Sequence, residues 1–185
     1  MKDIGTQKIE TERLILRRIE EKDAPAVFNN WASDPQVTRF LTWPTHEDLY
    51  TSEVVVKGWV REYARDDFYQ WAIVPKDLGE AIGTISVVRK DEKAETVEIG
   101  YCMGRKWWRQ GIMPEALRAV IRFMIEKAGY NRVEARHDVA NGASGAVMKK
   151  AGMKYEGTLR SAARNNQGLC DVAVYSILRQ ELYMN

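Results

Sequence analysis

The positions of apolar side chains alternate between the two-residue period of strands and the longer period of helices. In the N-terminal half, one strand-like stretch precedes two helical stretches, and three strand-like stretches follow in quick succession. Their ranges are Thr11–Ile19; Glu21–Ala32 and Glu47–Arg65; and Phe68–Val74, Ala81–Arg89 and Thr96–Met103. The short links between the last three predict an antiparallel meander. The Asp34-Pro35 pair is expected to close the first helix.

The C-terminal half begins with the most regular helical pattern of the chain. Met113, Leu117, Val120 and Met124 recur on one face of a helix that starts after Gly111. The stretches that follow are a strand over Arg132–Asp138, a helix over Ala143–Ala151, and strands over Lys154–Leu159 and Val172–Leu178. This order predicts a mixed α/β fold in one domain over residues 1–185. Its central sheet is expected to have about seven strands, mostly antiparallel, flanked by about four helices.

The overall composition is typical of a soluble globular domain. The chain has 185 residues, of which 45% are hydrophobic and 29% charged, and its net charge of +2 gives no support for a nucleic-acid partner. Apolar runs such as Val54–Val56 and Ala119–Ile121 are far shorter than a membrane span of about 20 residues. Cys102 and Cys170 have no metal-ligand spacing, so no metal is expected. The N-terminus lacks an apolar signal segment, so the expected location is cytoplasmic.

A glycine turn before the long helix is the first candidate binding site. At Gly111 the backbone can approach a ligand closely, and the free N–H groups of a helix N-terminus bind anions such as a pyrophosphate. Basic and aromatic residues precede this turn: Arg105, Lys106, Trp107, Trp108 and Arg109. Neither a G-x-G-x-x-G dinucleotide pattern nor a phosphate-binding P-loop is present. The alternative is that Gly111 only makes a tight turn.

Five motifs, in order along nearly the whole chain, resemble those of a known family. Two of them, Val97–Tyr101 and Trp108–Ala116, resemble the acetyl-CoA motif of the GNAT superfamily of N-acetyltransferases. The others are similar to the branch that contains the ribosomal-protein N-terminal alanine acetyltransferases (RimJ/RimL-like). They are Ile9–Arg17, Asn141–Ser144 and Lys150–Gly157, and Asp171 ahead of Val174–Ser176 is similar as well. The resemblance implies the GNAT fold, in which the fourth strand splays from the fifth.

The resemblance also implies acetyl-CoA as the cosubstrate. The splayed strand would be Thr96–Met103, where Tyr101 and Met103 would offer backbone groups to the pantetheine arm. A backbone N–H near Tyr101 would polarise the acetyl oxygen, and the pyrophosphate would lie on the amides of the turn before the long helix. The residues expected at the cofactor are Tyr101, Met103, Trp108, Arg109, Gln110, Gly111, Ile112, Met113, Asn141, Ser144 and Lys149.

Two polar residues begin the helix that follows the strand Arg132–Asp138. The resemblance implies that Asn141 bonds the pantetheine and that Ser144 protonates the departing thiolate. Because a thiol has a pKa of about 8.5, loss of Ser144 is expected to slow the reaction without abolishing it. The alternative for both residues is helix capping. Lys149 or Lys150 either reaches the 3′-phosphate of the cofactor or belongs to a solvated helix face.

The acceptor amine must lose a proton, so a base or a water relay is expected. Glu98, on the strand expected to splay, is the best carboxylate candidate, and its alternative role is that of a salt-bridged strand residue. Some relatives carry an acid in the segment that corresponds to Thr158–Gln167. This chain has none there, which favours Glu98 acting through water. Phe40 and Trp43, between the first two predicted helices, are expected to line the acceptor site together with Glu98.

The sequence therefore predicts an acetyl-CoA-dependent N-acetyltransferase that works by direct transfer in a ternary complex. The expected acceptor is a protein N-terminal α-amine, and the enzymatic alternative is a small amine such as an antibiotic, a polyamine or an amino acid. A CoA-binding regulatory module without efficient turnover is the alternative from another class. Glu98 and Ser144 argue against this module, whereas the missing acid in Thr158–Gln167 favours it. No nucleic-acid or membrane partner is expected, and a homodimer is in keeping with the family.

Overall fold

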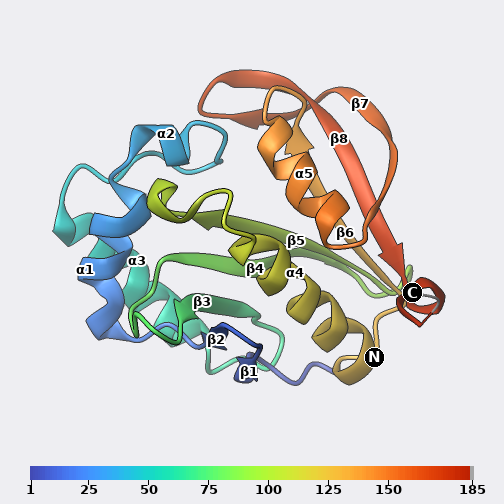
Figure 1. The fold of residues 1–185 in the computed structure, drawn as a ribbon, viewed down its shortest axis with the longest axis horizontal. Helices are drawn as coiled ribbons and strands as arrows, with labels where there is room; N and C mark the ends of the chain where they lie inside the picture. The colour runs from blue at the N-terminus through green and yellow to red at the C-terminus, as the bar shows by residue number, and fades with distance from the viewer. Residues whose placement is uncertain (184–185) are drawn as a thin grey trace.

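Figure 1 shows the computed structural model, which describes residues 1–183. Its centre is one eight-stranded sheet with the order β1-β2-β3-β4-β5-β6-β8-β7. All neighbouring strands are antiparallel except β5 and β6, which are parallel. The predicted mixed, mostly antiparallel sheet is therefore confirmed. The strand beyond the expected seven is β1, a two-residue segment that pairs with Leu16 and Ile15.

The strands agree closely with the alternating pattern wherever one of their faces is buried. They are β1 (Ile9–Glu10), β2 (Leu14–Arg17), β3 (Gln70–Pro75), β4 (Gly83–Asp91), β5 (Thr96–Met103), β6 (Arg132–Asp138), β7 (Lys154–Asn165) and β8 (Gly168–Leu178). The last two are longer than predicted and form one hairpin that ends at the pair Asn165↔Gly168. The extra residues of β7 are mostly exposed at the sheet edge, so their sequence carries no apolar alternation.

The helices differ from the prediction mainly near the N-terminus. They are α1 (Ala24–Val27), α2 (Pro35–Thr38), α3 (Leu49–Glu62), α4 (Ile112–Arg122), α5 (Gly142–Lys150) and α6 (Arg179–Leu182). The single helix predicted over residues 21–32 is divided into a 3-10 turn, α1 and a π-helical turn. Asp34-Pro35 also opens α2, because the Asp34 side chain accepts a hydrogen bond from the Gln36 N–H and Pro35 occupies the first helical position.

Helices cover the two faces of the sheet unequally (Figure 1). α4 packs on one face, where Leu117, Val120 and Met124 are fully buried in the larger apolar cluster, as their spacing predicted. α1 and α3 cover the other face over the N-terminal strands, in a second cluster that contains Trp31 and Val56. The second cluster does not include β6, β7 or β8. On that side β6 carries Arg132, Glu134 and Arg136, and β7 carries Glu156.

The sheet divides between β5 and β6. These strands pair at Thr96↔Arg132, Val97↔Val133 and Glu98↔Glu134, and their pairing ends there. Beyond this point β5 stays paired with β4 and β6 stays paired with β8. We call the end of pairing at Glu98 and Glu134 the fork. It is the splayed strand pair that the family resemblance implied.

Candidate active site

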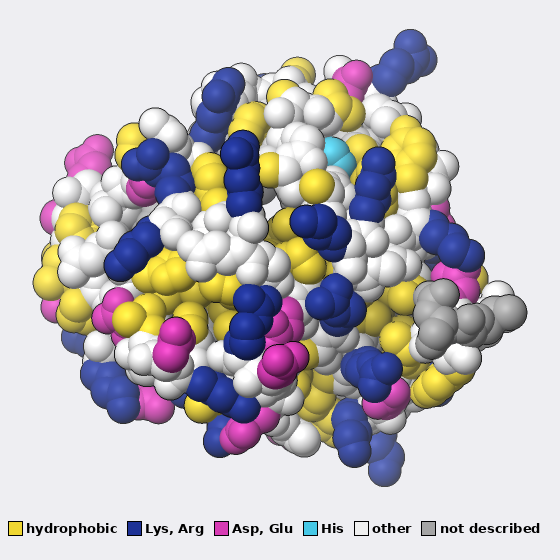
Figure 2. Space-filling view, viewed as in Figure 1, with side chains coloured by type: hydrophobic (Ala, Val, Ile, Leu, Met, Phe, Trp, Pro, Cys, Tyr) yellow, Lys and Arg dark blue, Asp and Glu magenta, His cyan; other side chains and the backbone are white. Residues whose placement is uncertain are grey.

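A cavity of about 710 Å³ lies at the open side of the fork. It is bounded by the end of β5, the turn before α4, one side of α5, and α2 with the loop that follows it. Figure 2 shows a hollow on this face with Lys and Arg side chains distributed around it. An apolar interior with a basic surround suits an anionic ligand that carries an apolar arm.

Most of the expected site residues meet at this cavity. Those that line it are Phe40, Tyr101, Met103, Trp108, Arg109, Gly111, Ile112, Met113, Asn141 and Ser144. Trp43, Glu98, Gln110 and Lys149 do not line it, and Lys150 lies there in place of its neighbour. The lysine on the cavity side therefore differs from the one expected. Trp43 instead borders a separate apolar cavity of about 210 Å³ together with Trp31, His46 and Trp59.

The turn before α4 has the geometry that an anion site requires. Gly111 is the helix N-cap with φ of 75°, and Arg109 also has a positive φ of 63°. A left-handed conformation is easy for glycine but costs about 1–2 kcal/mol for other residues. Within residues 1–183, the N–H groups of Gly111, Ile112 and Met113 have no protein acceptor. These N–H groups are free to bind a phosphate oxygen.

The turn is held in place by residues that the sequence did not reveal. Glu115, in the first turn of α4, accepts hydrogen bonds from Thr11 Oγ1 (2.6 Å), Arg13 N (3.0 Å) and Arg13 Nε (2.7 Å). Arg13 Nη1 also donates to the Gln110 carbonyl (3.0 Å). Burial favours a higher pKa for Glu115, but these hydrogen bonds outweigh it and hold the pKa below its usual value. Because Arg13 and Glu115 are 102 positions apart, no local motif could have indicated the pair.

Two hydroxyl groups meet at the start of α5. Ser144 Oγ lies 2.9 Å from Tyr101 Oη, and Tyr101 Oη donates to the Ser144 carbonyl at 3.1 Å. Burial raises the pKa of Tyr101 well above its usual value, so its hydroxyl stays protonated at neutral pH. The Tyr101 hydroxyl can donate to Ser144 Oγ as well as to the Ser144 carbonyl. When it donates to Oγ, the Ser144 proton is free to point into the cavity that Ser144 lines. The sequence indicated a role for the backbone of Tyr101 and missed its side chain.

Two other expected site residues already have protein partners. The Asn141 side chain accepts a hydrogen bond from Ser144 N at 3.4 Å, so the capping contact considered above is present. The Trp108 indole N–H donates to the Met103 carbonyl at 2.7 Å. That carbonyl is therefore satisfied within the protein. The roles of these residues toward pantetheine stay predictions.

The loop after α2 is attached to the tip of the β7–β8 hairpin. Asn166 N donates to the Leu41 carbonyl (3.1 Å), and Asn166 Nδ2 donates to the carbonyls of Thr38 (2.9 Å) and Trp43 (2.8 Å). The contact places Phe40 between two fixed points at the cavity wall.

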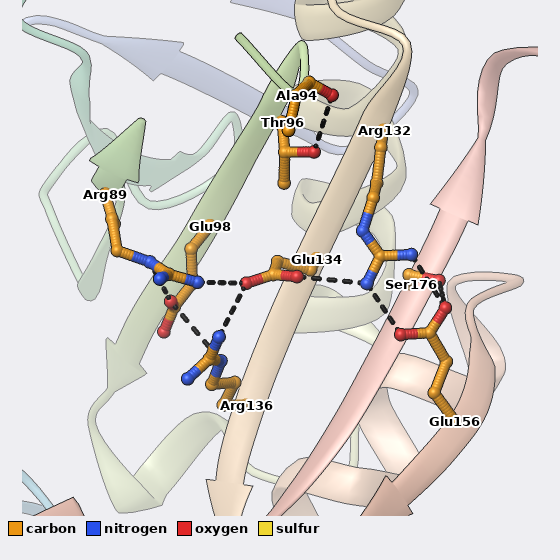
Figure 3. A network of polar contacts seen from close by, with 9 residues as sticks. All are labelled: Arg89, Ala94, Thr96, Glu98, Arg132, Glu134, Arg136, Glu156 and Ser176. Carbon is orange, nitrogen blue, oxygen red and sulfur yellow. Dashed lines mark hydrogen bonds and ion pairs between the residues drawn. The ribbon is translucent and has the colours of Figure 1, made fainter. Parts of the chain in front are cut away.

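Glu98 lies at the fork in a row of alternating charges that crosses the sheet (Figure 3). Its Oε2 accepts a hydrogen bond from Arg89 Nε at 3.0 Å and lies 3.4 Å from Arg136 Nε. Two guanidinium groups thus share one carboxylate oxygen. The salt-bridged alternative considered for Glu98 is what the structure shows.

The same row continues toward the edge of the sheet. Arg132 Nη2 contacts Glu134 Oε2 at 3.0 Å and Glu156 Oε2 at 2.6 Å, and Ser176 Oγ donates to Glu156 Oε1 at 2.7 Å. The hydrogen bond from Arg132 lowers the pKa of Glu156 to about 2. Figure 3 shows Glu156 at the end of the row away from Glu98.

Replacement of Glu156 by glutamine is expected to reduce stability more at neutral pH than in acid. A carboxylate with a depressed pKa stabilises the folded state above its unfolded pKa of about 4.5, and this contribution is lost as the pH falls toward 2. Because the side chain is 42% exposed, the loss should be about 1 kcal/mol at most, or about 2–4 °C in Tm for a protein of this size. Thermal unfolding of both proteins at pH 7 and pH 3 measures it. An equal Tm difference at the two pH values would contradict the assignment.

Comparisons with known proteins agree with this arrangement. An opened mixed sheet beside a free helix N-terminus is the arrangement expected of an acyl-CoA-dependent transferase. Residues 13–154 match the model of the acetyltransferase (GNAT) domain. The uncharacterized N-acetyltransferase YoaA of Bacillus subtilis (strain 168) is 32% identical over 171 residues, covering 92% of this chain and 96% of that protein. The chain therefore belongs to the GNAT acetyltransferase family and is an acetyl-CoA-dependent N-acetyltransferase.

Two further relatives carry more specific names. The ribosomal protein uS5-alanine N-acetyltransferase of Escherichia coli (strain K12) is 27% identical over 160 residues, covering 81% of this chain and 79% of that protein. The structure of RimL, named as a ribosomal L7/L12 α-N-protein acetyltransferase in complex with coenzyme A, superposes with a TM-score of 0.81 at 23% identity. It covers 93% of this chain and 98% of that one and shows a shared fold.

Within residues 1–183, every helix is too short or too polar to cross a membrane.

Proposed function

We propose that the enzyme acetylates a protein N-terminal α-amine by direct transfer in a ternary complex. The observation that carries this proposal is the cavity at the fork, where the Tyr101–Ser144 pair, the free amides at Gly111 and the Phe40 loop border one space. The names of the relatives that act on ribosomal proteins support a protein acceptor. The cytoplasmic location and the homodimer stay predictions of the sequence.

The arrangement supports a simple sequence of bond changes. The amine nitrogen forms a bond to the acetyl carbonyl carbon, the carbon–sulfur bond breaks, and the sulfur leaves as a thiolate that takes a proton. Ser144 Oγ supplies that proton while Tyr101 Oη donates to it across the 2.9 Å contact, and the proton that water takes from the amine returns to Ser144. The amides at Gly111 hold the phosphates away from the reacting atoms. Each residue therefore orients or protonates, and none forms a covalent intermediate.

The proton of the acceptor amine is assigned to water rather than directly to Glu98. The carboxylate of Glu98 does not line the cavity, and its Oε2 already contacts Arg89 and Arg136. A carboxylate outside the cavity, held by two guanidinium groups, has no direct contact with an amine bound in the cavity. This leaves the water relay, which the sequence had also allowed, as the favoured route.

A screen of acceptors tests the proposed function. Thiol release from acetyl-CoA is measured with peptides that begin with Ala, Ser or Met, with the same peptides blocked at the N-terminus, and with polyamines, aminoglycosides and amino acids. We expect release with free peptides and none with blocked ones. Release with small amines alone would contradict the protein acceptor, and binding of acetyl-CoA without release would favour a regulatory module.

Replacement of Phe40 by alanine is expected to weaken acceptor binding selectively. Phe40 lines the cavity from the loop after α2, and the Arg39 guanidinium lies 5.0 Å from its ring centroid. Loss of a partly buried aromatic contact should raise the acceptor KM about tenfold. The KM for acetyl-CoA should stay within about twofold, since that ligand is held mainly elsewhere. Leu49→Ala, at an exposed residue outside the cavity, is the matched control and should change neither constant.

A further inference from the structure

Four charged residues close the sheet at the fork. They are Arg89 on β4, Glu98 on β5, and Glu134 and Arg136 on β6. Glu98 and Glu134 are the last residue pair of the parallel ladder, so two carboxylates lie opposite each other on neighbouring strands. Like charges in this position repel and favour separation of the strands. Something must offset that repulsion where pairing ends.

Both arginines bridge both carboxylates. Arg89 places Nε 3.0 Å from Glu98 Oε2 and Nη2 2.5 Å from Glu134 Oε1. Arg136 places Nε 3.4 Å from Glu98 Oε2 and Nη2 3.0 Å from Glu134 Oε1. Figure 3 shows the two guanidinium groups on either side of the carboxylates. The result is a closed ring of four alternating charges across three strands.

The ring affects stability strongly because part of it is buried. The Glu134 side chain is 7% exposed, and although burial favours a higher pKa, hydrogen bonds from three arginines hold its pKa below the usual value. A buried charge that loses its partners is strongly destabilising. Arg136 lies two residues beyond the last β5–β6 pair, so its contact with Glu98 crosses the point of divergence. The ring therefore resists both closure and further opening of the strands.

We propose that Arg89, Glu98, Glu134 and Arg136 form a clasp that sets where β5 and β6 separate, and that they act in the proposed function as positioning residues for the pantetheine arm. Backbone groups beyond the fork can pair with an extended ligand only when the two strands are held at a suitable spacing. Holding that spacing before the ligand arrives reduces the ordering cost of binding. Glu98 then acts on affinity for acetyl-CoA rather than on proton transfer.

The test compares Glu98→Gln with Glu156→Gln. Both replace a carboxylate of the same row by its neutral isostere, but Glu156 pairs with Arg132 away from the fork. In calorimetry we expect Glu98→Gln to weaken acetyl-CoA binding about tenfold, or about 1.4 kcal/mol. Glu156→Gln should bind acetyl-CoA as the native protein does, despite its lower Tm. Equal weakening in both variants would overturn the clasp.

Kinetics separate positioning from proton transfer. With an acceptor that the native enzyme acetylates, Glu98→Gln should raise the acetyl-CoA KM, leave kcat within about threefold, and keep the shape of the pH–rate profile. A fall in kcat of about 100-fold with loss of the acidic limb and unchanged affinity would identify a base instead. If the native enzyme acetylated no acceptor, the proposed function would fail, while the clasp would still be judged on acetyl-CoA affinity.

A second variant tests the clasp in case Glu98→Gln fails to fold. Arg89 is 55% exposed at its side chain, so Arg89→Met should fold even if Glu98→Gln does not. It removes one guanidinium from both carboxylates and should also weaken acetyl-CoA binding, by about threefold or more. Native affinity in a folded Arg89→Met protein would overturn the clasp.

Discussion

Replacement of Gly111 by valine is expected to weaken acetyl-CoA binding about 100-fold, or about 2.7 kcal/mol. The backbone of Gly111 has φ of 75°, a region that β-branched residues rarely adopt. Relaxation of that strain would turn the amides of residues 111–113 away from their common direction. The added side chain would also keep phosphate oxygens at a distance. Calorimetric titration with acetyl-CoA measures the loss.

Gly79 provides a matched control for this experiment. It has the same φ of 75°, lies between β3 and β4, and would place an added Cβ with nothing within 4 Å. Gly79→Val should therefore lower Tm by a similar amount and bind acetyl-CoA normally, because Gly79 does not line the cavity. Undiminished affinity for acetyl-CoA in a folded Gly111→Val protein would show that the turn does not bind the cofactor.

Replacement of Ser144 by alanine should lower kcat about 10- to 100-fold with little change in the acetyl-CoA KM. Ser144 lines the cavity, the resemblance implies that it protonates the thiolate, and Tyr101 Oη can donate to its Oγ. A thiolate leaves without a proton donor more slowly, but the reaction continues because its pKa is only about 8.5. Steady-state kinetics at saturating acetyl-CoA provide the measurement.

Two companion variants define the origin of the effect. Ser144→Thr keeps the hydroxyl and should recover much of the native kcat. Tyr101→Phe removes only the partner hydroxyl and should give a smaller loss, about 3- to 10-fold, since Ser144 remains. A native kcat in Ser144→Ala would show that Ser144 is not the proton donor.

The sequence predicted the fold well where side chains alternate between core and solvent. Residues 132–138 were predicted as a strand with the observed bounds, because Val133 and Ala135 are buried in the main cluster. The pattern failed where no face is buried, as in the outer part of β7, whose extra residues are polar or small. It also missed the division of the first helix, since the 3-10, α and π segments are only 3, 4 and 5 residues long, too short for their different periods to appear in the apolar pattern.

Local motifs indicated candidate site residues, whereas contacts between residues distant in the sequence could not be predicted. Gly111 could be identified because a glycine before a periodic helix is a local signal, and φ of 75° agrees with it. Arg13 and Arg136 could not, because their functions depend on Glu115 and Glu98, which only the folded sheet brings near. Glu98 was noticed for its charge. Its ion-pair partners lie on other strands, so its role in the salt bridges could not be predicted from the sequence.

The divided sheet has a consequence for the lifetime of the protein in a cell. Within residues 1–183, the strands on either side of the division are joined directly by three residue pairs at the fork, so a ligand that bridges them also holds the two parts together. Binding to the folded state alone adds about 2.7 kcal/mol of stability when acetyl-CoA is at 100 times its Kd. Loss of the bound ligand would therefore increase the unfolded fraction that proteases can degrade.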